Sequence, residues 1–501
     1  MMDHLLNGLM TALSFDILPI LIFGVVGGII LGAMPGLTAT MGVAILLPFT
    51  FGMESTAALV MLIGVYIGGI YGGSISAILL NTPGTPASAA SVLDGYTLTR
   101  NGQAARALSI SAISSFTGGF ISTVLLIGFA PVLASFALKF SAPEYFALAL
   151  FGLTIISTIS GGDIMKGLLA GTIGLLISVV GLDPITSVPR FTFGVQDLYN
   201  GISIIPVLIG LFALSEALTQ LEGVISDKKQ KLDSFSLKML SRKDLKEIAP
   251  TAIKSGVIGT VIGSVPGAGA DIAAFVSYNE AKRASKTPED FGNGSIKGLS
   301  AAEAGNNGVT GGALVPLLTL GVPGDAVTAV LLGALIIQGL APGPLLFTYN
   351  PDIVYGIFSS MLIANIVMLV VGLLGIRFFC KIIEIPRILM IPIIMFLSII
   401  GAYSINNSMF DVGIAAFFGL LGFLFIKLKV PLSPILIAMI LGPMAETNLR
   451  KALLLSEGSW SFLYERPITL VFLGLTALSI YTAIKLNRKQ KAVIAEVEAA
   501  K

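Results

Sequence analysis

Four acidic side chains lie within otherwise apolar stretches of this 501-residue chain, and they offer the most distinctive chemistry. They are Asp271, Glu303, Asp325 and, at the margin of its stretch, Glu216. A carboxylate in such surroundings is costly, so it usually marks a functional position. Asp271 and Asp325 closely follow Pro-Gly pairs, which makes them candidates for binding a cation or carrying a proton. The alternative interpretation is that each one caps the N-terminus of a helix.

Residue counts exclude several other kinds of site. His4 is the single histidine and Cys380 the single cysteine, which excludes a histidine cluster for zinc, a Ser-His triad and a disulfide framework. No Gly-x4-Gly-Lys-Ser/Thr motif occurs, so the chain is not expected to hydrolyse ATP. Thirty Lys and Arg stand against 28 Asp and Glu, which leaves no basic excess for nucleic acid. We expect neither an enzyme nor an organic cofactor.

The elements that must position the acids are membrane-spanning helices. Apolar residues make up 55% of the chain, charged residues 12%, and the mean hydropathy is +0.93. A soluble domain carries about 25% charged residues. The apolar runs reach the roughly 20 residues that a helix needs to cross a hydrocarbon core. We therefore predict an all-α polytopic membrane protein with about 12 transmembrane helices, the first one an uncleaved helix near residues 17–34.

The sequence of the first half recurs in the second. Small residues at every fourth position form a ladder that ends in Pro-Gly, first in Gly24-x3-Gly28-x3-Gly32-x2-Pro35-Gly36 and, 231 residues later, in Ser255-x3-Gly259-x3-Gly263-x2-Pro266-Gly267. Such a ladder lets another helix backbone approach closely. A second pair of matching breaks, offset by 240 residues, is Asn81-Thr-Pro-Gly-Thr-Pro and Gly321-Val-Pro-Gly-Asp.

The repeat and the charges suggest how the chain is organised. We expect a first membrane repeat at 1–225, a basic cytoplasmic connecting loop at 226–250, a second membrane repeat at 251–485 and a cytoplasmic tail at 486–501. Lys and Arg cluster in the loop and the tail, whereas residues 1–16 contain none, so the N-terminus is expected on the periplasmic side. The two ladder helices then enter from opposite faces, as in the inverted repeats of secondary transporters.

The Pro-Gly breaks are the candidate binding site, with Pro-Gly-broken or re-entrant helices at the centre of the protein. A break frees backbone N–H and C=O groups at membrane depth; N–H groups at a half-helix start can hold an anion, and carbonyls can hold Na⁺. The predicted substrate-binding residues are Pro35, Gly36, Thr38, Thr40, Asn81, Thr82, Pro83, Gly84, Thr85, Pro86, Gly267, Gly269, Asn306, Asn307, Pro323 and Gly324. Asp271 and Asp325 are the predicted ion-coupling residues. The alternatives are that the breaks only mark loops and that the two Asn side chains only cross-link helices.

These motifs together resemble a known family. Gly32-Ala-Met-Pro-Gly-Leu-Thr-Ala-Thr, Asn81-Thr-Pro-Gly-Thr-Pro-Ala-Ser-Ala, Asp94-Gly-Tyr, Gly263-Ser-Val-Pro-Gly-Ala-Gly-Ala-Asp and Gly321-Val-Pro-Gly-Asp resemble the large membrane subunit of tripartite tricarboxylate transporters, the TctA family. The resemblance covers essentially the whole chain. It implies a multi-pass subunit in the bacterial inner membrane that takes up citrate or another small carboxylate by Na⁺ or H⁺ symport. The implied partners are a small membrane subunit and a periplasmic solute-binding protein, and a homodimer is left open.

Two alternatives come from other classes. A stand-alone carboxylate transporter or channel without accessory subunits is compatible with the repeat. An intramembrane aspartyl protease is disfavoured, because Gly321-Val-Pro-Gly-Asp325 lacks the Gly-x-Gly-Asp spacing and no Tyr-Asp pair occurs in the chain.

Overall fold

The computed structural model describes residues 2–34, 37–154, 164–183, 185–223, 240–267, 269–376, 378–379 and 387–481. Three predicted features lie wholly or partly outside these residues. They are the Pro35–Gly36 break, most of the connecting loop at 226–250 and the tail at 486–501.

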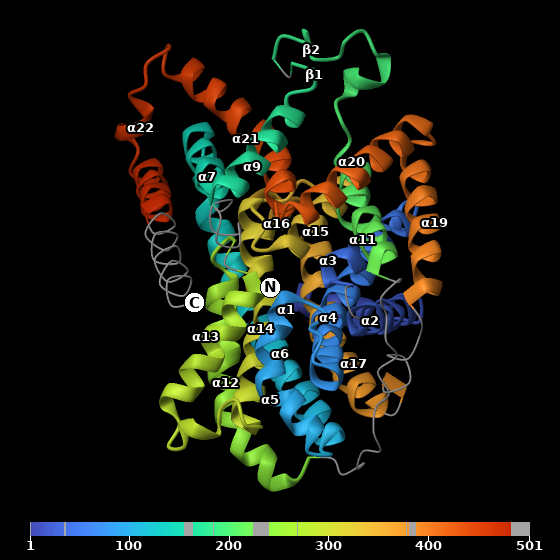
Figure 1. Ribbon diagram of the computed structural model, residues 1–501. Helices are drawn as coiled ribbons and strands as arrows, with labels where there is room; N and C mark the ends of the chain where they lie inside the picture. The colour runs from blue at the N-terminus through green and yellow to red at the C-terminus, as the bar shows by residue number, and fades with distance from the viewer. Residues whose placement is uncertain are drawn as a thin grey trace, which may run out of the picture.

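The first half is built from helices and one short hairpin (Figure 1). Its helices are α1 (Met2–Ala12), α2 (Leu18–Ala33), α3 (Ala39–Leu46), α4 (Ser55–Leu80), α5 (Ala89–Arg100), α6 (Ala104–Ala137), α7 (Ala142–Thr154), α9 (Ile164–Ser178), α10 (Ile204–Leu208) and α11 (Ser215–Gly223). Short 3-10 turns are η1 (Leu47–Thr50), η2 (Pro86–Ser88) and η3 (Gln196–Asn200), and a π-helical turn, η4 (Ile209–Leu214), joins α10 to α11.

The second half is also helical. Its elements are α12 (Arg242–Gly263), α13 (Gly269–Ala284), η6 (Pro288–Asp290), α14 (Ile296–Leu320), α15 (Ala326–Ile337), α16 (Pro344–Tyr349), α17 (Pro351–Leu374), α19 (Arg387–Asn406), α20 (Met409–Lys427), α21 (Ser433–Leu455) and α22 (Phe462–Glu465). Ser241 caps the start of α12 by accepting a hydrogen bond from the backbone N–H of Asp244, so this helix begins within the range expected for the connecting loop.

Five helical stretches in the described part of the chain are long and apolar enough to cross a membrane: α4, α6, Ile204–Glu222, α17 and α20. Shorter apolar helices accompany them at Leu18–Ala33, Ala39–Thr50, Ile164–Ser178, Ala326–Ile337, Ile391–Ser404 and Pro467–Tyr481. The chain is therefore a multi-pass helical membrane protein, as predicted. The number of about 12 crossings and the inversion of the repeats stay predictions.

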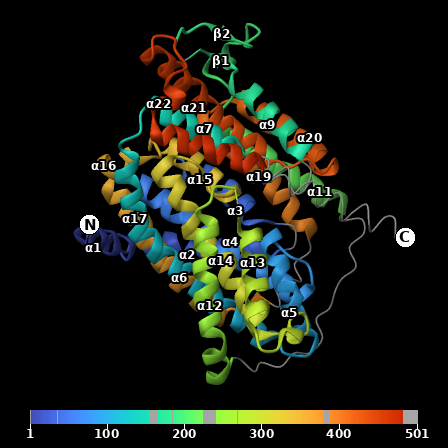
Figure 2. The ribbon, with the colours of Figure 1, turned by 90° about the vertical axis from the view of Figure 1, so that its left-hand side faces the viewer.

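A two-stranded hairpin is an exception to the all-α expectation. Strands β1 (Gly181–Leu182) and β2 (Pro189–Arg190) pair antiparallel and project at the top of the molecule in both views (Figures 1 and 2). Arg190 fixes the hairpin to α21 through a 2.8 Å ion pair with Glu446. Each strand has only two residues, which is too short for the alternation that identifies a strand in a sequence.

Helices α4 and α14 form the centre of the core. Every residue of α4 from Ala57 to Leu79 is buried, as is every residue of α14 from Gly298 to Thr319. α2 packs along α4, and α12 packs along α14. Each half also contributes a helix to the other, because α6 packs on α14 and α17 packs on α4. Figure 2 shows α4, α6, α12, α13 and α14 together below the layer that contains α9, α20 and α21.

Candidate functional site

The small-residue ladders let helix backbones touch in both halves. A Cβ atom added at Gly28 of α2 would lie 2.4 Å from the carbonyl oxygen of Val65 in α4. A Cβ added at Gly259 of α12 would lie 2.2 Å from the carbonyl oxygen of Gly305 in α14. Gly28 corresponds to Gly259 by the 231-residue offset and Val65 to Gly305 by the 240-residue offset. The two ladders therefore make the same contact, and they hold α4 and α14 in equivalent positions.

The second pair of breaks also adopts matching backbone geometry. α4 ends at Asn81 with φ 58°, and α14 ends at Gly321 with φ 72°. Both are left-handed residues that terminate a helix, a conformation that Gly and Asn tolerate best. Beyond them, a Cβ at Gly84 would meet Cα of Gly73 at 2.9 Å, and a Cβ at Gly324 would meet Cα of Ala313 at 2.6 Å. The chain therefore turns back against its own central helix in each half.

Each turn leads into a capped half-helix. Thr85 accepts a hydrogen bond from the backbone N–H of Ser88 at 3.3 Å, and its own N–H donates to Oγ of Ser88 at 3.1 Å. In the second half, Oδ1 of Asp325 accepts from the N–H of Thr328 at 2.7 Å, and the Asp325 N–H donates to Oγ1 of Thr328 at 2.8 Å. This reciprocal pattern is a capping box. The capping interpretation of Asp325 is thus correct for one of its two oxygens.

The other oxygen of Asp325 binds a tyrosine from the first half. Oδ2 accepts a 2.7 Å hydrogen bond from the hydroxyl of Tyr66 in α4. Asp325 is buried. Among the described residues, the groups that act most strongly on its carboxylate include no lysine or arginine. A buried carboxylate without a cationic partner is costly, so a cap alone does not account for an acid here.

Asp271 lies close to Asp325 but in a different environment. Asp271 occupies the first turn of α13, where its side chain is exposed, and the two carboxylates interact electrostatically. The breaks in front of them are joined directly, because the N–H of Gly267 donates to the carbonyl of Gly324 at 2.8 Å. Gly269 has a φ of +70° at the start of α13. The two predicted ion-coupling residues therefore lie near each other, whereas their role in ion coupling stays a prediction.

The first-half break meets the second half. Ala87 of η2 is buried in a cluster with Ala270 and Ala273 of α13 and with Val309 and Ala313 of α14. Ala313 is also the residue on which Gly324 closes. The structure therefore places η2 and the preceding Thr85 against one stretch of α14. The Pro323–Gly324 break packs against the same stretch.

The remaining predicted residues are placed less centrally. Thr38 caps α3 by accepting from the N–H of Met41 at 3.3 Å, and Thr40 is buried in the first turn of that helix. Asn81 and Pro83 are exposed, and the hydroxyl of Thr82 donates to the carbonyl of Leu80 at 3.2 Å.

Asn306 and Asn307 are fully buried in α14. Neither polar atom of the Asn306 amide has a hydrogen-bond partner among the described residues. Nδ2 of Asn307 donates to Oγ of Ser115 at 2.9 Å, whereas its Oδ1 has no such partner. The two side chains have four polar amide atoms between them. Of these, only Nδ2 of Asn307 is explained by a cross-link to another helix in the described part of the chain.

Two features of this region were not predicted from the sequence. One is Tyr66, which corresponds to Asn306 by the 240-residue offset, so the repeat itself could have identified it. The other is the surroundings of Glu303, whose carboxylate is met by serine hydroxyls from the first half. Nothing in the local sequence of those serines marks them.

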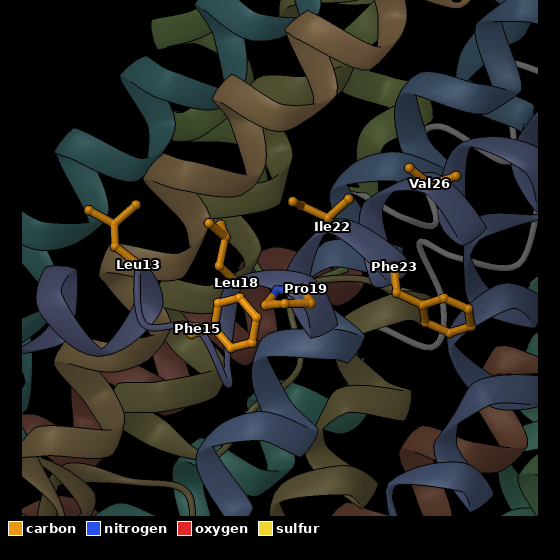
Figure 3. A pocket seen from close by; sticks show the side chains of 7 residues that line it. All are labelled: Leu13, Phe15, Leu18, Pro19, Ile22, Phe23 and Val26. Atoms are coloured by element: carbon orange, nitrogen blue, oxygen red, sulfur yellow. The ribbon is translucent and has the colours of Figure 1, made fainter.

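The pocket in Figure 3, of about 620 Å³, lies away from these polar residues at the turn between α1 and α2. Its lining is apolar throughout: Leu13, Phe15, Leu18, Pro19, Ile22, Phe23 and Val26. Such a surface fits a hydrocarbon chain and offers no donor to an anion.

The fold and these breaks define a multi-pass helical membrane protein with acids and amides buried at its centre. The chain belongs to the tripartite tricarboxylate transporter TctA family, whose model matches residues 18–437. This is a family of transporters rather than of enzymes, and it implies a system with further subunits. The resemblance seen in the sequence motifs is thereby confirmed.

Two relatives come from Agrobacterium vitis. An uncharacterized 52.8 kDa protein of the TAR-I ttuC' 3' region is 38% identical over 501 residues, which cover 99% of this chain and all of the relative. An uncharacterized protein of the TAR-II ttuC' 3' region is 37% identical over 226 residues, 45% of this chain and 93% of that relative. No solved structure matches the chain.

Proposed function

We propose that the chain is the large transmembrane subunit of a binding-protein-dependent secondary transporter. It takes up tricarboxylates such as citrate, or related carboxylates, across the bacterial inner membrane by Na⁺ or H⁺ symport. A periplasmic solute-binding protein delivers the substrate, and a small membrane subunit completes the system. Membership in the TctA family supports this assignment.

The observation that carries the proposal is the pair of matched, capped half-helices at the two breaks. Each presents a helix N-terminus after a backbone turn, at Thr85 and at Asp325. A helix N-terminus attracts an anion through its dipole and through the N–H groups that its cap leaves free. We infer that the substrate carboxylates bind between these two ends, with Asn306 and the Pro323–Gly324 backbone as further contacts.

The acids explain why a cation must accompany the substrate. Asp271 and Asp325 are negative when ionised, and a di- or tricarboxylate that enters between the half-helices is repelled by them. A cation or proton at these acids removes the repulsion, so the affinity for substrate rises after the cation binds. The cation also offsets the membrane potential, which costs about 2.3 kcal/mol per negative charge per 100 mV for inward movement.

The proposal is tested with the complete system in proteoliposomes. Labelled citrate and a panel of dicarboxylates are offered with the binding protein and the small subunit, under an inward Na⁺ gradient or an inward pH gradient. We expect accumulation that depends on one gradient and on both accessory proteins. No accumulation of any carboxylate would refute the proposal. Accumulation by the large subunit alone would support the stand-alone alternative instead.

A further inference from the structure

Glu303 lies in the N-terminal third of α14 and is completely buried. Within the described residues, the groups that act on its carboxylate most strongly are serine hydroxyls, with no lysine or arginine among them. An ionised carboxylate at such a position needs a positive charge nearby, because its hydration is lost. Neither the predicted site nor the two capped half-helices uses this residue.

Hydroxyl groups from three first-half helices surround the Glu303 carboxylate. Ser91 of α5 donates to Oε1, and Ser115 of α6 donates to Oε2 at 2.9 Å. The hydroxyls of Ser74 in α4 and Ser111 in α6 also lie near the carboxylate, and neither has a hydrogen-bond partner within the described parts of the chain. The cluster therefore has more polar groups than the two carboxylate oxygens engage.

Further oxygen atoms in this cluster lack a partner. Oδ1 of Asn307 is buried and accepts no hydrogen bond from any described residue, while its Nδ2 donates to Ser115 at 2.9 Å. The hydroxyl of Tyr71, in the vicinity of Glu303, is likewise buried and has no hydrogen-bond partner among the described residues. Buried polar atoms are almost always hydrogen-bonded, so several unpartnered ones around one carboxylate indicate a missing ligand.

The charge and the donor set specify the ligand. One carboxylate together with hydroxyl and amide oxygens is a hard-oxygen environment, which suits Na⁺, Mg²⁺ or Ca²⁺ better than a soft metal. A monovalent ion makes the site neutral, whereas a divalent ion leaves a net positive charge in the core. The described residues contain no group of three His, Cys, Asp or Glu that would balance a divalent ion. A proton would neutralise Glu303 but would leave the surplus oxygens unpartnered.

We propose that this cluster is a Na⁺ site distinct from Asp271 and Asp325. The Glu303 cage consists of Glu303, Ser74, Ser91, Ser111, Ser115 and Asn307. The ion binds the carboxylate, and the serine hydroxyls rotate to present lone pairs in place of the protons they now donate. Ser91 lies on α5, the helix that follows Thr85 and η2. Bound Na⁺ therefore strengthens the packing of α5 on α14 and orders Thr85 and η2. This coupling role rests on the proposed symport; the existence of the ion site does not.

The site is tested on the full-length protein in detergent, without transport. Thermal unfolding and equilibrium binding of ²²Na⁺ are measured in NaCl and in choline chloride of equal ionic strength. We expect the midpoint of unfolding to rise with NaCl in a saturable manner, because a ligand that binds the folded state stabilises it. Glu303→Gln keeps the shape of the side chain. It should remove the Na⁺ ion bound at this site, and with it the part of the Na⁺ response that this ion causes. Ser115→Ala should weaken the binding about 5–150-fold.

Ser109→Ala is the matched control. Ser109 is a buried serine on α6, the helix of Ser111 and Ser115, and its hydroxyl donates to the carbonyl of Ala105 at 2.7 Å. This variant should bind Na⁺ as the unmodified protein does. Na⁺ binding that is unchanged in both Glu303→Gln and Ser115→Ala would overturn the proposal. A stability that responds to pH but not to Na⁺ would also overturn it, because the site would then hold a proton.

The outcome separates this inference from the proposed function. Should Glu303→Gln fail to fold, Ser91→Ala and Ser115→Ala decide the question, since each removes one hydroxyl and no charge. Na⁺ binding that depends on Glu303, without any carboxylate uptake, would support the Na⁺ site at the Glu303 cage and refute the proposed symport function. Na⁺-driven uptake, together with Na⁺ binding that is unchanged in Glu303→Gln, Ser91→Ala and Ser115→Ala, would support the symport function. It would refute the Na⁺ site at the Glu303 cage.

Discussion

The hydroxyl of Tyr66 donates a 2.7 Å hydrogen bond to Oδ2 of Asp325, which joins the central helix of the first half to the break of the second. Oδ1 of the same carboxylate is already used by the cap to Thr328. Tyr66 therefore occupies the one oxygen of Asp325 that is not committed to holding α15 in place.

The first prediction concerns the coupling acids. Asp271→Asn and Asp325→Asn keep the shape of each side chain and remove its charge. We expect at least one of the two to abolish ion-dependent accumulation in proteoliposomes, because a cation loses its ligand or a proton its carrier. If both variants retain full ion-dependent accumulation, the two acids are structural caps.

Tyr66→Phe is the control for structure at Asp325. It removes the hydrogen bond between the halves but leaves the carboxylate, so we expect a loss of about 1–3 kcal/mol in the free energy of unfolding. Ion dependence of uptake should persist in this variant. Its loss would mean that the hydrogen bond, and not only the charge, is needed for coupling.

The second prediction concerns the hydroxyls of the first break. Thr85→Val and Thr82→Val replace a hydroxyl by a methyl group of similar size. We expect each to reduce uptake without loss of protein from the membrane, and the lost contact corresponds to about 5–150-fold in substrate affinity. Thr97→Val is the control, because the hydroxyl of this half-buried α5 residue donates to the carbonyl of Leu93 in its own helix, at 3.2 Å. Uptake kinetics that are unchanged in both variants would mean that the substrate binds elsewhere in the protein.

The third prediction concerns the packing of α2 on α4. Gly28→Ala places a methyl 2.4 Å from the carbonyl oxygen of Val65, so the helices must separate. We expect this to cost about 1–3 kcal/mol of stability. Gly27→Ala is the matched control on the same helix, because its methyl would meet only a side-chain carbon of Leu46, at 4.0 Å. Thermal unfolding in detergent should show a lower midpoint for Gly28→Ala and no decrease for Gly27→Ala.

The fourth prediction is a pH dependence outside the membrane spans. Burial raises the pKa of Asp244, but the hydrogen bonds from Arg106 and Ser241 outweigh it and hold this pKa at about 2. Because the pKa is lower in the folded state than in the unfolded state, near 3.9, the stabilisation is complete above pH of about 4. It is lost as the pH falls toward 2.

Asp244→Asn measures this contribution. The variant should lower the free energy of unfolding by on the order of 1 kcal/mol, by the same amount at pH 6 and pH 8. The difference from the unmodified protein should shrink below pH of about 4. A difference that grows as the pH falls would contradict the assignment.

The fifth prediction concerns the inversion of the repeats. Asn7 and Lys246 are both exposed and flank the starts of the two ladder helices, so single cysteines there, introduced with Cys380 replaced, report their sides. We expect an impermeant thiol reagent to label Asn7→Cys from the periplasmic face and Lys246→Cys from the cytoplasmic face. Labelling of both from one face would refute the inverted arrangement.

Features that depend on local composition and spacing could be predicted from the sequence. A charged fraction of 12% excludes a soluble fold. The ladders at Gly28 and Gly259 predict close helix contacts, because an i, i+4 spacing of small residues creates a smooth stripe on any helix. The cap at Asp325 is also local, since Asp and Thr three residues apart can satisfy each other around one helix start.

The polar contacts between the two halves, in contrast, follow from long-range packing and could not be predicted from any local pattern. Tyr66 and Asp325 are 259 positions apart, and Ser91 and Glu303 are 212 apart. A serine on an apolar helix carries no signal of its partner, because its hydroxyl can also bond to a carbonyl of its own helix. The Glu303 cage exists because α4, α5 and α6 all pack against α14, and that packing depends on the whole set of helix contacts rather than on any one segment.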